Sequence, residues 1–359
     1  MRIPINGRAR AVVAANLILA LTQTASAVVA TGGNSTNDSG GYRIHTFTNS
    51  ATASNLVVTV GGDIEVLVVA GGGGGGYDVG GGGGAGGLIY SNAFTVIASN
   101  YTVTAGTGGL GSTSSHRAGY NGSNSVFGFL TAGGGGGVGG WNGSGNNALS
   151  GGSGGGGYGD NGSGTTPAGT NIASGQGNAG GLGLRSDSSP PYGRGGGGGG
   201  AGAAGTNGAV GGNGGNGLQY SISGVATWYA GGGGGSDDAG TSPGLGGLGG
   251  GGTNGVAGAA NTGGGGGGGS GNGGAGGSGI VIVRYAYDAS KPVIENSPAT
   301  NVTAASAWLN GYLVSTGEAP VTAVAVYWGA ADGGAPTSEL WQATNTLTDD
   351  GTWTNGAYL

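Results

Sequence analysis

Residues 71–279 hold 88 of the chain's 102 glycines, and this concentration limits the possible folds more than any other feature of the sequence. An ordinary globular domain has about 7% glycine and about 25% charged residues. Only 7% of this 359-residue chain is charged. Because glycine has no side chain to bury, the region cannot be held together by an ordinary hydrophobic core.

The glycine runs allow two interpretations. Collagen is excluded, because there is no G-X-Y period and the chain has only nine prolines. Aperiodic glycine-rich segments commonly form flexible linkers. Alternatively, the runs form extended left-handed helices with three residues per turn (polyglycine II), packed closely side by side. A single run would lose more conformational entropy than its hydrogen bonds return, so only a bundle anchored at its ends is expected to be stable.

Strand-like segments stand on both sides of the glycine-rich region. Residues 42–70 contain YRIHTF, NLVVTV and IEVLVVA, which are rich in β-branched and aromatic residues, and GIVIVRYAYD follows the last glycines. We expect Glu65 to Ala70 and Ile280 to Tyr285 to pair with each other. That pairing would fasten the glycine region at its base and make it one domain.

The first 27 residues have the organisation of a secretory signal peptide. A basic segment with Arg2, Arg8 and Arg10 precedes an apolar run over residues 11–21, and Ala-Ser-Ala at 25–27 is a typical cleavage motif. The apolar run is shorter than the roughly 20 residues that a membrane-spanning helix needs. The sequence therefore predicts a secreted or surface protein with no membrane span after cleavage.

Composition argues against several classes of function. Without the signal peptide the chain has six basic and fifteen acidic residues, a formal charge of −9. No basic patch is present for nucleic acid or anionic lipid. The chain has no cysteine and two histidines, which we place in a strand (His45) and in a loop (His116). We predict that the protein is not an enzyme and needs no cofactor.

One pattern leaves a metal alternative open. GGxGxD occurs at residues 73–78 and 232–237, and it begins the nonapeptide that binds calcium in parallel β-helices. Neither copy repeats in tandem, so an acidic turn between glycine runs is the favoured interpretation.

The order of several segments points to a known family. IEVLVVAGGGGGG follows the YRIHTFTNS strand, and GGGGAGGLIY, YTVTAGTGG and GGAGGSGIVIVRY come after it. Over about residues 41–286 the chain resembles the glycine-rich domain of phage tail-fibre adhesins and large secreted bacterial proteins. The resemblance implies an all-β base that carries a packed bundle of polyglycine II helices, with binding at loops on the distal tip. Phage tails assemble in the cytoplasm, so the signal peptide favours a secreted bacterial protein.

The last segment has different sequence character. ATNVTAASAWLNGYL and AVYWGAADGG alternate as β-sandwich strands do, and they resemble a fibronectin type III-like module. Such modules have about 90 to 100 residues, so this one is predicted to be incomplete. The predicted domains are a signal peptide (1–27), a linker (28–40), the glycine-rich β/polyglycine domain (41–288) and the incomplete module (289–359).

The aromatic residues between glycine runs are the candidate binding residues. Tyr77, Trp141, Tyr158 and Tyr192 are expected in turns, either as tip contacts that stack on a surface glycan or polymer or as plain solvated residues. Two further aromatic residues, Trp228 and Tyr229, are expected to pack into the strand base as core residues. We predict an adhesin-like structural protein for attachment to surfaces, glycans or extracellular matrix. The alternatives are a passive spacer of a larger exported protein and a phage-derived tail-fibre adhesin.

Overall fold

The computed structural model describes residues 28–48, 53–113, 118–139, 147–159, 165–171, 175–185 and 193–287, and elsewhere the backbone of seven strands. The chain divides into two compact units, Val28–Ala286 and Met1–Ala27 together with Tyr287–Leu359. The described residues form strands and contain no helix, so the all-β prediction is confirmed for them.

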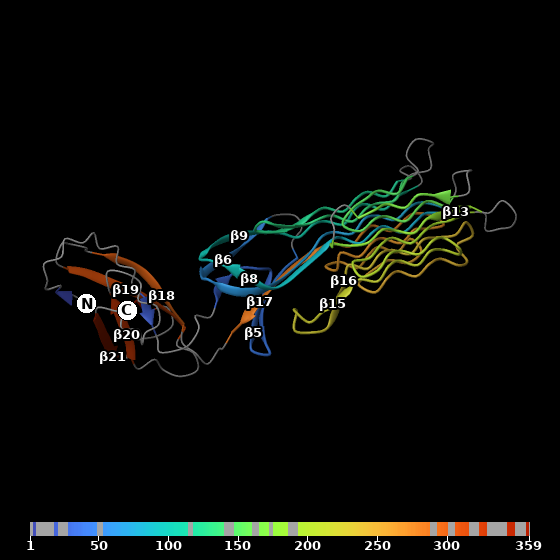
Figure 1. Ribbon diagram of the computed structural model, residues 1–359. Helices are drawn as coiled ribbons and strands as arrows, with labels where there is room; N and C mark the ends of the chain where they lie inside the picture. Colours follow the sequence, from blue (N-terminus) through green and yellow to red (C-terminus); the bar gives the residue numbers. More distant parts are fainter. Residues whose placement is uncertain are drawn as a thin grey trace. The chain divides into compact units, whose positions relative to one another are not determined.

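Two five-stranded antiparallel sheets form the base of the unit Val28–Ala286 (Figure 1). The first has the order β4-β5-β17-β7-β8 and consists of β4 (Ser35–Ser39), β5 (Tyr42–Phe47), β17 (Ile280–Ala286), β7 (Gly62–Val69) and β8 (Leu88–Val96). The second has the order β11-β10-β9-β6-β3 and consists of β11 (Leu130–Ala132), β10 (Ser125–Phe127), β9 (Ser99–Thr104), β6 (Ser54–Val60) and β3 (Val29–Thr31). The segments YRIHTF, NLVVTV and IEVLVVA thus form the predicted strands.

The first sheet is covered on both faces. One face packs against the second sheet through a core that includes Leu56, Val66, Phe127 and Val281, all fully buried. The other face packs against the hairpin of β15 (Leu218–Tyr220) and β16 (Thr227–Tyr229). Because β7 and β17 are buried on both faces, they read in the sequence as continuous apolar runs.

The predicted pairing of the two flanks of the glycine region is confirmed. Strands β7 and β17 are antiparallel neighbours, with Ile280 opposite Val69 and Arg284 opposite Glu65. The chain therefore enters and leaves the glycine-rich region at the same place in the sheet. This arrangement closes the insertion at its base.

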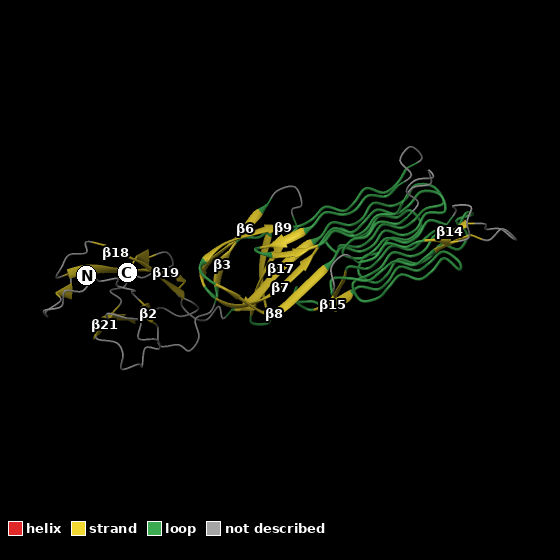
Figure 2. Cartoon of the chain, turned by 45° about the horizontal axis from the view of Figure 1, so that its top comes forward, coloured by secondary structure: helices red, strands yellow, loops and turns green. Residues whose placement is uncertain are grey.

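From the base the glycine runs extend in one direction and lie side by side (Figure 2). At their far end is a small antiparallel sheet of β12 (Thr165–Thr166), β13 (Gly183–Arg185) and β14 (Gly193–Arg194).

Residues 28–40 differ from the linker prediction. They form β3 and β4, which pair with β6 and β5, respectively. The turn at Gly32 and Gly33, with φ of +122° and +97°, lets the chain pass from one sheet to the other. The segment is polar enough to resemble a linker, but its edge-strand position does not require an apolar sequence.

The second unit contains the strands of the C-terminal segment. They are β18 (Val293–Thr300), β19 (Ser306–Ser315), β20 (Ala323–Trp328), β21 (Ala343–Thr348) and β22 (Ala357–Tyr358). Two short strands within the predicted signal peptide, β1 (Ile3–Pro4) and β2 (Ile18–Ala20), pair with β19 and β20. The fibronectin-like and signal-peptide assignments stay predictions.

Candidate functional site

The glycine run at 71–76 is bound to its surroundings through every backbone N–H group. Each N–H donates to a carbonyl oxygen of another run, and the partner run recurs at every third residue. The donor–acceptor pairs are Gly71–Ser123 (3.1 Å), Gly74–Tyr120 (2.9 Å), Gly72–Gly277 (2.9 Å), Gly75–Gly274 (2.8 Å), Gly73–Gly84 (2.8 Å) and Gly76–Gly81 (3.0 Å).

The carbonyl groups of the same run follow the same three-residue period toward other neighbours. They accept from Gly135 and Val138, from Gly109 and Ser112, and from Gly266 and Gly269. Three neighbours through N–H and three through C=O give this run six hydrogen-bonded neighbours. Runs 80–87, 195–200 and 231–236 have the same organisation. The bundle is a lattice of backbone hydrogen bonds.

The close approach of the runs explains why the interior residues are glycine. A Cβ atom added at Gly73, Gly83 or Gly233 would lie against the carbonyl oxygen of a neighbouring run, closer than real Cβ atoms come. The obstacle is backbone, which cannot rotate away as a side chain can. An interior run therefore has almost no tolerance for other residues.

Asparagine side chains terminate the lattice at its edges. Their Oδ1 atoms accept backbone N–H groups of the adjacent run, in two cases from residues three apart. The pairs are Asn121 with Gly137 (2.8 Å), Asn124 with Gly134 (2.9 Å), Asn213 with Leu245 (2.8 Å), Asn216 with Leu248 (3.0 Å) and Asn207 with Leu182 (2.8 Å). The side-chain amide carbonyl thus takes the place of a missing run.

The predicted tip aromatics do not form one site among the described residues. Tyr77 is partly exposed in the turn between the first two runs. Tyr158 is buried, with 2% of its surface exposed, so the prediction of an accessible ring is wrong for this residue. Gly157, the residue before Tyr158, and Tyr158 itself lie against the backbone of Gly183 in β13. Trp141 and Tyr192 lie outside the described residues.

The GGxGxD pattern at 232–237 ends in a turn. Oδ2 of the buried Asp237 accepts hydrogen bonds from Thr241 Oγ1 (3.0 Å) and from the Ser242 N–H (3.1 Å), as in an acidic turn. Its Oδ1 has no hydrogen-bond partner, and Arg194 faces Asp237 across an antiparallel bridge. These contacts agree with the acidic-turn interpretation.

At the base, a charged cluster fixes the β15–β16 hairpin to the sheet. Arg284 on β17 forms an ion pair with Glu65 on β7 (2.6 Å) and donates to the carbonyl oxygen of Ser221 (2.9 Å). Its guanidinium lies 4.4 Å from the ring centroid of Tyr42, which is a cation–π contact. Tyr90 donates to Glu65 (2.9 Å), and burial, followed by this hydrogen bond, raises the pKa of Tyr90.

The two aromatic residues predicted for the strand base have different environments. Tyr229 is buried in the core beneath the hairpin, as predicted. Trp228 is 37% exposed, so its assignment to the core is wrong. Neighbouring residues of a strand face opposite sides, so only one of the two can face the core.

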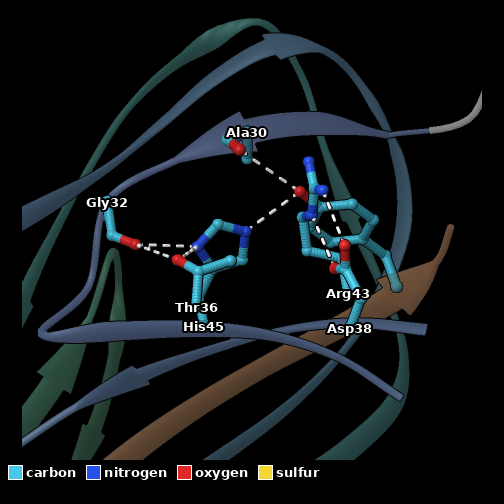
Figure 3. A network of polar contacts seen from close by, with 7 residues as sticks. Ala30, Gly32, Thr36, Asp38, Arg43 and His45 are labelled. Carbon is cyan, nitrogen blue, oxygen red and sulfur yellow. Dashed lines mark hydrogen bonds and ion pairs between the residues drawn. The ribbon is translucent and has the colours of Figure 1, made fainter. Parts of the chain in front are cut away.

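A second polar network lies inside the base, at His45 of β5 (Figure 3). His45 Nδ1 is 2.7 Å from the carbonyl oxygen of Gly32, and Nε2 is 3.0 Å from the hydroxyl of Tyr285. The Tyr285 hydroxyl is also 3.3 Å from the carbonyl oxygen of Ala30. Burial is the largest influence on His45 and lowers its pKa. The sequence placed His45 in a strand, but nothing in it indicated these distant partners.

The comparisons define the family. The glycine-rich domain family matches residues 48–286, which is two thirds of the chain, and the chain belongs to this family. No curated protein matches the chain. In the part that the structure describes, no helix is long and apolar enough to cross a membrane.

Proposed function

We propose that this chain is a secreted, non-enzymatic attachment protein whose glycine bundle is a rigid support for the turns at its distal end. The observation that carries the proposal is the three-residue hydrogen-bond period of the runs, with six neighbours around each interior run. A bundle connected in this way resists bending and shear. A flexible linker would have no such fixed partners.

We further propose that the runs are polyglycine II helices. That conformation has three residues per turn, so each neighbour is met again at every third residue. The period of the contacts of run 71–76 supports this assignment. Scalar couplings across hydrogen bonds, measured by NMR between Gly73 and Gly84 and between Gly76 and Gly81, are the direct test. Couplings to sequence neighbours would contradict the assignment.

Export through a signal peptide is part of the proposal. The cleavage motif ends at Ala27, and the compact glycine-rich unit begins at Val28. Cleavage there would remove β1 and β2 from the mature protein and leave the base intact. N-terminal sequencing of protein recovered outside the cell is expected to begin at Val28.

The proposed ligand is a surface glycan or extracellular polymer that stacks on aromatic rings near the tip. Tyr77 is the described candidate, with Trp141 and Tyr192 from the sequence prediction. Replacing all three by alanine is expected to reduce attachment to polysaccharide-coated surfaces at least tenfold. Tyr120→Ala is a matched control, because Tyr120 is 50% exposed on the side of an outer run.

The burial of Tyr158 also gives weight to the passive-spacer alternative, since one of four candidate contacts is inaccessible. A spacer needs the bundle but no tip chemistry. Unchanged attachment of the triple variant would favour the spacer over the attachment protein.

A further inference from the structure

The partners of His45 define its protonation state at neutral pH. The Gly32 carbonyl can only accept, so Nδ1 carries the proton and donates to it at 2.7 Å. Nε2 is then an acceptor and receives the hydroxyl proton of Tyr285 at 3.0 Å. His45 is 1% exposed, so this neutral ring is held without access to water.

A second proton would rearrange this network. Nε2 would become a donor to the Tyr285 oxygen, and the hydroxyl proton of Tyr285 would turn to the Ala30 carbonyl, 3.3 Å away. Every polar atom keeps a partner, but the ring then carries a buried charge. The charged groups nearest to it are Asp38 on β4 and Arg43 on β5, which pair with each other at 2.8 Å. Asp38 is therefore already neutralised and gives little compensation.

Water reaches the charged ring at the lowest cost in free energy if the segment that contains Gly32 and Thr36 moves away from it. Gly32, in the turn before β4, and Thr36, in β4, contact the ring, and every residue of β4 is exposed. β4 pairs on one side only, with β5. Release of β4 would break one ladder of hydrogen bonds and the Asp38–Arg43 ion pair, and it would leave β3 on β6 and the β5–β17–β7 centre of the sheet intact.

We propose that His45 is an acid-sensitive latch that fastens β4 and the turn before it, residues 32–40, to the base and releases this segment when the surroundings become acidic. The direction of the pH dependence follows from the burial of the His45 ring. The pKa of His45 is lowered in the closed state, so the open state binds protons more readily once the pH falls below about 6.5. The segment is held above that pH and is progressively released below it.

Amide hydrogen exchange on the full chain at pH 7.5 and pH 5.5 tests the latch. After correction for the intrinsic pH dependence of exchange, protection of residues 35–39 is expected to fall by up to about tenfold at pH 5.5. His45→Gln is expected to abolish this difference. The chain has only two histidines, so His116→Gln is the matched control and is expected to keep it. An equal fall in His45→Gln, or none in the unaltered protein, would overturn the latch.

A second measurement covers the case in which His45→Gln leaves the segment open at both pH values. Nitrogen-15 NMR of the unaltered protein is expected to show the Nδ1–H tautomer of His45 at pH 7.5. His45 is also expected to titrate below the ordinary pKa of histidine, about 6.5. A titration midpoint of His45 at or above that ordinary value would refute the latch.

Discussion

An asparagine side chain ends in the same C=O and N–H groups as a peptide unit, and this similarity matters at the edge of the glycine bundle. Asn213 and Asn216 are three residues apart, as are the N–H groups of Leu245 and Leu248 that they accept. The two side chains therefore match the period of the lattice. Their Oδ1 atoms accept the N–H groups that the carbonyl oxygens of a further run would otherwise accept.

Loss of these side chains should destabilise the unit by a predictable amount. Asn213→Ala and Asn216→Ala are each expected to lower the free energy of unfolding by about 1 kcal/mol, because water replaces the side-chain acceptor only in part. Denaturant unfolding measures the change. Asn272→Ala is the control, since Asn272 is exposed and has no side-chain hydrogen bond among the described residues. An equal loss in the control would contradict the capping role.

Single residues show where sequence reasoning was sufficient and where it was not. The expectation that Tyr229 packs into the strand base is confirmed, whereas the asparagine spacing in GGNGGNG led to no prediction and acquires a physical reason only from the lattice. Tyr158 was expected to be accessible because it interrupts a glycine run. Its burial depends on which segments lie beside it in three dimensions, such as Gly183 of β13, and the sequence does not show these neighbours.

At the scale of elements, each glycine run depends on backbone atoms of its neighbours for its position. Gly83→Ala would place a methyl group against the carbonyl oxygen of Gly73 in the adjacent run. Both runs would have to separate, with a loss of about 3 kcal/mol in the free energy of unfolding. Gly271→Ala is the matched control, because an added Cβ there meets nothing within 4 Å. Thermal unfolding of the two variants should therefore differ clearly, and equal melting temperatures would contradict close packing.

The ion pair of Arg284 and Glu65 is expected to stabilise the attachment of the β15–β16 hairpin. Each side chain is 17% exposed, so the pair is partly shielded from water. Arg284→Met should lower the free energy of unfolding by about 2 kcal/mol and raise amide exchange in residues 218–229. Arg43→Met removes the more exposed pair with Asp38 and should cost no more than about 1 kcal/mol. Equal effects of the two substitutions would contradict the assignment.

The main elements of the base were predictable, because their apolar runs are long and carry β-branched residues. The pairing of β7 with β17 followed from two such runs on either side of one insertion. The β3 and β4 strands were missed, since β3 has only three residues and β4 is polar throughout, and neither carries a periodic signal. The order of the runs in the bundle could not be predicted either, because glycines give no information on which neighbour each run meets.

The whole glycine-rich unit is stabilised in two ways, by a hydrophobic core in the base and by backbone hydrogen bonds in the bundle. The base has an ordinary hydrophobic core between two sheets, with Leu56 and Val66 fully buried. The bundle has backbone hydrogen bonds between runs far apart in the sequence, such as Gly72 with Gly277. The described runs 71–76, 80–87, 195–200 and 231–236 take their hydrogen-bond partners from outside themselves, so we expect the bundle to form only when the base has brought its ends together.

Amide hydrogen exchange across residues 71–279 tests the central claim, that the glycine runs form an ordered lattice, most directly. Interior runs 71–76, 80–87, 195–200 and 231–236 are expected to show protection comparable to that of β7 and β17, because their N–H groups are buried and bonded. Exchange in these runs at the rate of an unstructured chain would contradict the lattice and make the region a solvated linker.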